Sequence, residues 1–368
     1  MRSAQTAARA GIVSSRANAN DKTWLLWAAF CNDLLVDPWL AEKDLDPVIL
    51  LQVFAERYRT GKIAPRGKPV KYRTVEGALR AVGQAFASVG AKDPRLTADG
   101  KTTFRLSRQL RGYSRADPPP DRVKPVPISV MHHSACLAQH HCTIESLAVV
   151  SMMCIAFFFL CRPGKYTAPT GSNAPFRLVD VTFYVGSRRV LAVNASEDDL
   201  RRVTFVTLTF TTQKNAVRGE VIGLGLSGDP FVCPVLSTAR QVRHLLLHNA
   251  PPETPLCTYY QDDRAHYVTP TDITTTMQAS VRALGSVIGF TPKEVSARSL
   301  RAAGAMALLC AHVDSDTIKL LGRWRSDEML RYLTVQAQPI MRDFASRMLQ
   351  GGQYTLLPNA TIPVGPAV

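Results

Sequence analysis

The sequence lacks the short motifs that identify several large classes of protein. It contains no Walker phosphate-binding loop and no nucleophile elbow of the kind found in serine hydrolases. Its most apolar run, residues 147–161, is shorter than the roughly 20 residues that a helix needs to span a bilayer. These absences give no support to an ATPase, a serine hydrolase or a membrane protein, and they predict that the apolar run is a buried helix.

Acidic residues are scarce beside the basic ones. The chain has 29 Asp and Glu against 44 Lys and Arg, which gives a formal net charge of +15. Lys and Arg side chains that neutralise phosphates release counterions, so an excess of this size favours a nucleic acid partner. A basic surface with no partner is the alternative.

Cysteine-based frameworks are missing as well. The eight cysteines are scattered, and Cys154, Cys161 and Cys310 lie in apolar helical patterns, which predicts reduced thiols in an intracellular protein. One cluster has metal-ligand types at helical spacing: His132, His133, Cys136, His140, His141 and Cys142. Because it has no Cys-x-x-Cys pair and no second knuckle, we predict a helix surface, no metal site and no cofactor.

The length of 368 residues and the 46% hydrophobic content allow two domains. The first 20 residues contain three arginines and no acid, which is typical of a flexible basic arm, with an organelle transit peptide as the alternative. A proline-rich linker, residues 116–127, follows a helical module. We therefore predict a flexible basic arm over 1–20, a helical domain over 21–115, the linker over 116–127, a second domain over 128–350 and a tail over 351–368.

The predicted N-terminal domain is all-helical and basic. Apolar periodicity predicts helices from Asp21 (its cap), over 47–58, over 72–89 and over 102–113. The loop 61–73 carries charge of one sign, which favours phosphate contact over an ordinary solvated face: Lys62, Arg66, Lys68, Lys71 and Arg73. The last helix carries three arginines, three residues apart, which can lie along the phosphates of a groove: Arg105, Arg108 and Arg111.

Beyond the linker the pattern becomes mixed. Helices are predicted over 129–139, 143–160, 235–248, 269–288, 298–311, 315–321, 327–335 and 339–349, with Gly322 ending the one at 315–321. Strands are predicted over 176–185, 189–193, 203–212 and 217–224. The fold class is thus mainly α, with a small antiparallel β-sheet in the C-terminal domain. Lys214 falls at the tip of a hairpin, where a lysine more often serves only to keep an edge soluble.

One stretch combines several cationic side chains with a tyrosine. Residues 296–332 contain Arg298, Arg301, Arg323 and Tyr332, and Arg162 directly follows the apolar run upstream. A guanidinium donates a planar fork of N–H groups to phosphate oxygens and keeps its charge, so arginines can hold a phosphodiester whose charge grows in the transition state. A tyrosine hydroxyl is then a suitable nucleophile. Arg162 simply capping the apolar helix is the plain alternative.

These residues resemble the tyrosine recombinases, the phage-integrase-like DNA recombinases. The phrases that carry the resemblance are FFFLCRPGKYT, FTTQKNAVRGEVIGLG and SLRAAGAMALLC with LLGRWRSDEMLRYL, which look most like the crypton and DIRS types of eukaryotic mobile elements. The resemblance implies a helical DNA core-binding domain over 21–115 and a tyrosine recombinase catalytic domain over 128–350, with Arg162 and Arg301 as the catalytic arginines. It implies Lys214 as the lysine that protonates the leaving 5′ oxygen and Tyr332 as the nucleophile of a 3′-phosphotyrosyl link, without metal or ATP. It also implies double-stranded DNA as partner, a tetramer on DNA and a nuclear or other DNA-containing compartment.

Three positions depart from the family pattern. Arg298 stands where the family has His or Lys, Arg323 stands where it often has His or Trp, and Lys165 stands where an acid is usual. Arginine does not exchange protons near neutral pH, so Arg298 can stabilise charge but cannot act as a general base. Two hypotheses follow: an active recombinase, or a repurposed copy that binds DNA without cutting it. A type IB topoisomerase is a lesser enzymatic alternative.

Overall fold

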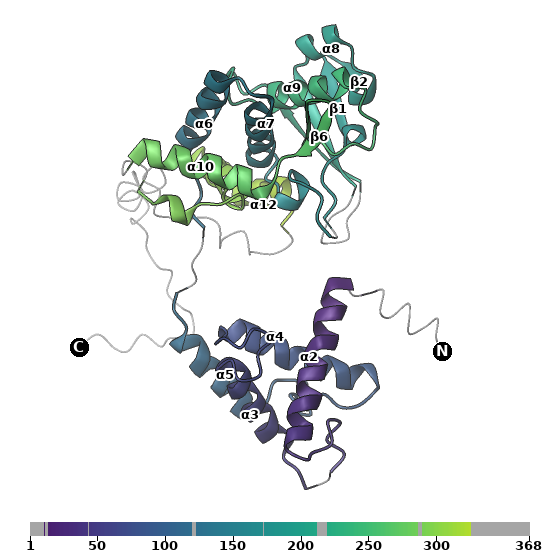
Figure 1. The fold of residues 1–368 in the computed structure, drawn as a ribbon, viewed down its shortest axis with the longest axis vertical. Helices are drawn as coiled ribbons and strands as arrows, with labels where there is room; N and C mark the ends of the chain where they lie inside the picture. The colour runs from purple at the N-terminus through teal and green to yellow at the C-terminus, as the bar shows by residue number, and fades with distance from the viewer. Residues whose placement is uncertain are drawn as a thin grey trace, which may run out of the picture. The chain divides into compact units, whose positions relative to one another are not determined.

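The computed structural model describes residues 11, 14–42, 44–119, 123–171, 173–211, 219–285 and 289–324. The chain divides into two compact units, Met1–Pro120 and Asp121–Val368 (Figure 1). The boundary falls inside the proline-rich stretch 116–127. Each unit has its own hydrophobic core, so each is described by itself.

The N-terminal unit is helical over its described residues. Its helices are α2 (Ser14–Asp33), α3 (Pro47–Arg59), α4 (Tyr72–Ser88) and α5 (Phe104–Ala116). An aromatic cluster fills the core, where the Trp27 ring meets the Phe54 ring edge-on with centroids 5.2 Å apart. Edge-to-face contacts of this kind stabilise aromatic pairs beyond the area that they bury. Three or more helices around one such cluster make a module that can fold around its own core.

The predicted helices of this unit are present, with one corrected start. On α4, Val75, Leu79, Val82 and Phe86 are buried, as their spacing predicts. Helix α3 starts at Pro47 after Asp46, whose carboxylate accepts the Val48 N–H at 2.9 Å. Helix α2, however, begins at Ser14 and not at Asp21. Residues 14–20 extend the helix by about two turns before Asp21. A residue of good N-capping type therefore does not by itself mark the start of a helix.

The C-terminal unit packs helices and a small sheet around one core. Its helices are α6 (Ile128–His141), α7 (Ile144–Phe158), α8 (Glu197–Arg202), α9 (Pro234–Leu247), α10 (Pro270–Leu284), α11 (Ser299–Cys310) and α12 (Ser315–Gly322). Its strands are β1 (Val181–Val185), β2 (Arg188–Leu191), β3 (Phe205–Phe210), β4 (Glu220–Gly225), β5 (Thr258–Gln261) and β6 (Arg264–Tyr267). The mainly α prediction with a small antiparallel sheet is confirmed.

Helix α7 is the centre of this unit. It packs against α6, α9, α10 and α11, and every residue from Ala148 to Phe157 is buried. A helix that is apolar on all sides needs such an enclosure. The prediction of a buried helix is therefore confirmed: the helix spans residues 144–158 and is buried over residues 148–157. None of the helices in the described ranges has the length and apolar character that a membrane span requires.

The main sheet has the strand order β2-β1-β3-β4, and each neighbouring pair is antiparallel. The hairpin β3–β4 pairs Phe210 with Glu220 at the end next to its connecting loop, where the Gly219 N–H donates to the Phe210 carbonyl at 3.0 Å. Both strands of the predicted hairpin are present. Lys214, Tyr332 and the two helices predicted over 327–335 and 339–349 lie outside the described residues.

Two elements were absent from the sequence prediction. The hairpin β5–β6 turns at Asp262 and Asp263, which both have left-handed φ angles (49° and 58°). Asp adopts this conformation less readily than Asn or Gly, so the turn signal was weak. Helix α8 has only six residues, held by a capping box between Ser196 and Asp199. Six residues are too few to show apolar periodicity.

Gly304 lets α11 approach α7 closely. A Cβ at this position would lie 2.1 Å from the Phe157 carbonyl oxygen and 2.4 Å from the Leu160 Cδ2 atom. We predict that Gly304→Ala lowers the free energy of unfolding by about 1–3 kcal/mol, because one of the helices must move. Gly77→Ala on α4 is the matched control, since nothing lies within 4 Å of its added methyl group.

Gly77→Ala is expected to raise stability by roughly 0.5–1 kcal/mol, because glycine is a poor helix former. Urea unfolding followed by circular dichroism gives both values. Equal effects of the two substitutions would contradict the close contact between α7 and α11.

Candidate functional site

The turn that carries Arg162 follows the carboxyl end of α7. Leu160 has a left-handed φ of 49°, and the Cys161 N–H donates to the Ala156 carbonyl at 2.9 Å, which is a Schellman ending with leucine where glycine is usual. A short 3-10 turn over Pro163–Lys165 comes next. Arg162 lies between these two turns and its side chain is exposed. The end of α7 thus delivers a cation to the surface.

Two more arginines converge on the same helix end. Arg301 on α11 donates through Nη1 to the Leu160 carbonyl and through Nη2 to the Gly322 carbonyl, both at 2.5 Å. Arg323 donates through Nη2 to the carbonyls of Phe159 (2.9 Å) and Leu160 (3.1 Å). The last carbonyls of a helix lack intrahelical donors and carry partial negative charge. They therefore stabilise two guanidinium groups that would otherwise repel each other.

Aromatic rings cover both guanidinium groups. The Arg301 Cζ lies 4.1 Å from the centroid of the Trp324 ring, and the Arg323 Cζ lies 3.8 Å from that of the Phe210 ring. Cation–π contacts of this length are favourable, and more so when the cation is partly removed from water. Arg301 is only 5% exposed. The rings and carbonyls together fix the orientation of both arginines.

The predicted helix over 315–321 extends one residue further than expected. Gly322 is the last residue of α12, and Arg323 adopts the left-handed conformation (φ 58°) at the carboxyl cap. A Cβ at position 322 would lie 1.6 Å from the Trp324 ring. Glycine is needed here to accommodate the tryptophan ring, a contact that no local sequence pattern indicates.

Tyr166 connects the Arg162 turn to the start of α11. Its hydroxyl donates to the Ala297 carbonyl at 2.6 Å, and burial raises the pKa of this tyrosine well above its usual value. Arg298 follows directly, with its backbone N–H donating to the Ser296 hydroxyl at 3.3 Å and its side chain exposed. The buried hydrogen bond therefore sets the spacing between the segments that bear Arg162 and Arg298.

The electrostatics of the site are strongly positive. Burial lowers the pKa of Arg323, the Cys161 thiol and Glu220 oppose that shift, and the charge of Arg162 adds to it. Burial likewise lowers the pKa of Lys165, whose Nζ donates to the Ala174 carbonyl at 2.9 Å. Such a concentration of cations is suited to an anionic group with several oxygens, such as a phosphodiester.

The structure brings together Arg162, Arg301 and Arg323 at the carboxyl end of α7, and it places Arg298 directly before α11, next to the Ala297 carbonyl that Tyr166 binds. Lys214 and Tyr332 are outside the described residues, so their places in the site stay predictions. The base of the hairpin that contains Lys214 does reach the site, because Phe210 covers Arg323. Trp324 was missed as a site residue, and its position beside Arg323 was the available signal.

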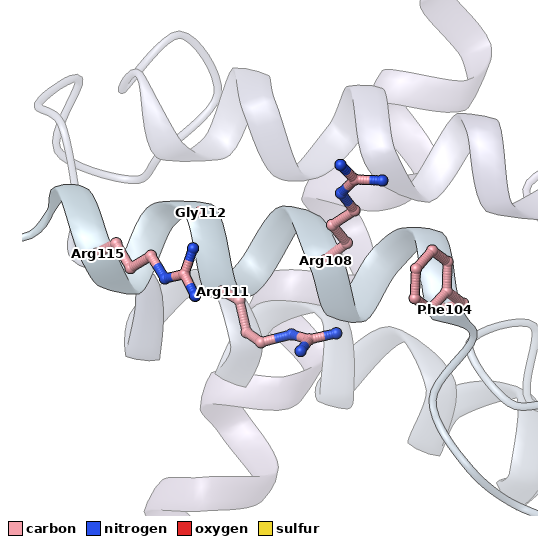
Figure 2. Close-up of a pocket in the computed structure, with 5 residues that line it drawn as sticks. All are labelled: Phe104, Arg108, Arg111, Gly112 and Arg115. Atoms are coloured by element: carbon pink, nitrogen blue, oxygen red, sulfur yellow. The ribbon is translucent and has the colours of Figure 1, made fainter.

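A basic face lies along α5 of the N-terminal unit. Arg108, Arg111 and Arg115 line a shallow hollow of about 370 Å³ together with Phe104 and Gly112 (Figure 2). Helix α5 contains no acid. Arg105 points elsewhere, since its Nη2 pairs with the Asp46 carboxylate at 2.5 Å. Arg115 therefore lines this hollow with Arg108 and Arg111. The sequence pattern predicted Arg105 as the third arginine of this row.

The basic loop before α4 is held against the end of α5. The Asp117 carboxylate accepts the Tyr72 N–H at 2.8 Å and pairs with Arg59, which also donates to the Val70 carbonyl at 2.6 Å. Five cationic side chains of this segment are exposed: Lys62, Arg66, Lys68, Lys71 and Arg73. The loop and the α5 face consequently form neighbouring basic surfaces on one unit.

Two other motifs carry no site. Residues 223–228 have the spacing G-x-G-x-x-G, but they end the antiparallel strand β4, and α9 begins only at Pro234. A dinucleotide fingerprint requires the glycines to open a helix after a parallel strand. Among the described residues no group of three or more His, Cys, Asp or Glu side chains could hold a metal ion.

Comparison with known proteins places the fold. Neither a family model nor a curated protein sequence matches the chain. The integrase of the transposon Tn1549, solved with transposon right-end DNA, aligns with 94% of this chain and 98% of its own, at 12% identity and a TM-score of 0.50. The chain has the tyrosine recombinase fold.

Two further recombinase structures align less closely. XerH bound to its difH substrate covers 86% of this chain and 74% of its own, at 11% identity and a TM-score of 0.46. XerA covers 95% and 96%, at 11% identity and a TM-score of 0.36. At sequence identities this low, structural similarity shows only the fold and does not distinguish types of tyrosine recombinase. The crypton or DIRS resemblance therefore stays a hypothesis.

Removal of the Tyr166 hydroxyl tests the link between the Arg162 turn and α11. We predict that Tyr166→Phe lowers the free energy of unfolding by about 1–3 kcal/mol, because the buried Ala297 carbonyl loses its donor. Hydrogen exchange of residues 296–301 is expected to accelerate. Tyr267→Phe on the exposed strand β6 is the control and should change neither quantity. Unchanged exchange in Tyr166→Phe would show that the link does not position Arg298.

Proposed function

We propose that the protein is a site-specific DNA recombinase or integrase that cleaves DNA through a 3′-phosphotyrosyl intermediate. The observation that carries the proposal is the convergence of Arg301 and Arg323 on the α7 carbonyls that directly precede Arg162. It occurs in a chain with the tyrosine recombinase fold. An anion-binding site and a DNA-processing fold thus coincide.

In this proposal the arginines hold the scissile phosphate. Arg162 and Arg298 present exposed guanidinium groups, while Arg301 is fixed by carbonyls and by the Trp324 ring. Donors that are oriented before the reaction stabilise the growing charge of a pentacoordinate phosphorus without reorganising. Charge-assisted hydrogen bonds to phosphate oxygens are among the strong ones. Arg162 and Arg298 are therefore the groups that contact the phosphate, and the buried Arg301 adds its fixed positive charge.

The bond-making steps fall to Tyr332 and Lys214. The tyrosine hydroxyl loses its proton to water as its oxygen forms a bond to phosphorus, the bond from phosphorus to the 5′ oxygen breaks, and Lys214 gives that oxygen a proton. The new phosphotyrosyl bond keeps the energy of the phosphodiester, so rejoining to a second 5′ hydroxyl needs neither ATP nor metal. The same proposal includes double-stranded DNA as the partner and assembly of the protein into a tetramer on that DNA. It also includes a location in the nucleus or another DNA-containing compartment.

The N-terminal unit supplies the DNA-binding surface in this proposal. The α5 face offers three arginines and an exposed Phe104, and the loop 61–73 offers five further cations. Arginines of this kind contact phosphates and fix the register of a protein on the duplex, while an apolar ring can contact a base.

A second function is favoured by the departures at Arg298, Arg323 and Lys165. In it, the protein binds DNA and regulates without cutting. Arg298 takes the place of a group that exchanges protons, and the loss of a general base typically costs about 10² to 10⁴ in rate. Binding without cleavage is therefore the competing outcome of the tests below.

Covalent trapping tests the chemistry. We predict that the protein forms a denaturation-resistant adduct with nicked suicide duplexes drawn from a randomised pool, because the nick lets the 5′ end diffuse away before rejoining. Tyr332→Phe is expected to abolish the adduct, whereas Tyr354→Phe, which changes the next tyrosine along the chain, should leave it intact. Salt-sensitive DNA binding with no adduct would instead support the binding-only function.

Salt-dependent binding tests the α5 face. We predict that Arg111→Ala lowers the magnitude of the slope of log affinity against log salt by about one, as loss of one phosphate contact should. Arg105→Ala is the matched control, because the Asp46 carboxylate already engages that guanidinium. Fluorescence anisotropy on a labelled duplex gives both slopes. An equal change in the two variants would argue against a defined α5 surface.

A further inference from the structure

We propose that Arg323 is a positioning residue that fixes the base of the β3–β4 hairpin against the carboxyl end of α7, and that it does not bind the phosphate. The proposal rests on the proposed function, in which that hairpin carries Lys214. It replaces the expectation that Arg323 belongs to the phosphate-binding set.

The hydrogen bonds of Arg323 all point into the protein. Its Nη2 group donates to the Phe159 and Leu160 carbonyls, and its Nη1 group donates to the Leu321 carbonyl at 2.9 Å. These acceptors belong to the end of α7 and the end of α12. A guanidinium has five N–H groups in a rigid fork, so three bonds to main-chain carbonyls define its plane.

The face of the same guanidinium covers the hairpin. Phe210 is the last residue of β3, and its ring lies 3.8 Å below the Arg323 Cζ. The Phe176 ring supports Phe210 from another side, edge-on with centroids 4.8 Å apart. In register, Phe210 pairs with Glu220, the first residue of β4. Arg323 therefore acts at the point where the chain leaves the sheet toward Lys214 and returns from it.

The backbone of Arg323 explains how the side chain reaches this point. Its φ of 58° reverses the chain after α12. Non-glycine residues other than Asn and Asp seldom adopt this left-handed conformation, because the Cβ atom lies too close to the following carbonyl oxygen. The contacts of the Arg323 side chain with the ends of α7, α12 and β3 offset the strain of this backbone conformation. Arg323 is therefore suited to hold these three elements together.

A brace and a phosphate ligand predict different chemistry. If Arg323 holds the hairpin, its loss displaces the lysine that protonates the leaving 5′ oxygen. A substrate with a 5′-bridging sulfur needs no such proton, because a thiol is far more acidic than an alcohol and leaves as a thiolate. If Arg323 holds the phosphate, its loss slows both substrates alike.

The test compares Arg323→Lys with the unaltered protein on ordinary and 5′-bridging phosphorothiolate suicide duplexes. Lysine keeps the charge and loses the fork. We expect adduct formation on the ordinary substrate to slow by about 10² or more, as loss of a general acid does, and the rate on the sulfur substrate to stay within about threefold. Equal slowing on both substrates, or no slowing on either, would overturn the proposal.

A second variant guards against misfolding of the first. Phe210→Leu removes the ring that Arg323 covers and leaves the arginine in place, with Phe205→Leu at the other end of β3 as control. If Arg323 holds the hairpin, Phe210→Leu should slow adduct formation on the ordinary substrate and leave the rate on the sulfur substrate nearly unchanged. Phe205→Leu should slow neither reaction. A Phe210→Leu protein as fast as the control on the ordinary substrate would overturn the proposal. An unaltered protein that forms no adduct with either substrate would instead refute the proposed function itself.

Discussion

The carboxyl end of α7 is the constraint on which the site depends. The helix is buried, so its last carbonyls have no access to water and must find donors within the protein. Arg301 and Arg323 provide them, and in doing so they bring α11, the end of α12 and strand β3 to one place. The Leu160 carbonyl accepts from both arginines and lies two residues before Arg162. A single requirement of backbone hydrogen bonding thus assembles side chains from four distant parts of the sequence.

The same arrangement concentrates positive charge. Helix-end carbonyls, aromatic rings and the nearby Glu220 offset part of it, and the exposed Arg162 and Arg298 leave the surface positive. Lys165 adds to the excess, and its Nζ is directed to the Ala174 carbonyl, on the side of Phe176. A site built this way is suited to an anion with several oxygens. In the proposed function, proton transfer therefore depends on groups outside the arginine cluster.

Apolar periodicity and residues typical of helix ends predicted most of the helices and strands. The sequence also indicated the arginines of the candidate site. The α4 residues Val75 and Leu79 and the apolar α7 run were clear because one face, or the whole helix, must be buried. Local patterns could not predict that Gly322 accommodates Trp324, that Arg323 takes the left-handed cap, or that Arg105 pairs with Asp46. Each of these depends on a contact with a residue whose place is set by the tertiary fold. The early start of α2 shows the opposite case, in which a capping residue lies within a longer helix.

The central claim is that the arginines around the end of α7 hold one scissile phosphate. The most direct measurement is a crystal structure of the protein with a nicked duplex trapped by orthovanadate, which takes the geometry of the pentacoordinate phosphorus. We predict guanidinium nitrogens of Arg162 and Arg298 within hydrogen-bonding distance of the vanadate oxygens, with Arg301 and Arg323 still bonded to main-chain carbonyls. Vanadate bound elsewhere on the protein, or reached by only one of the two exposed arginines, would contradict this claim.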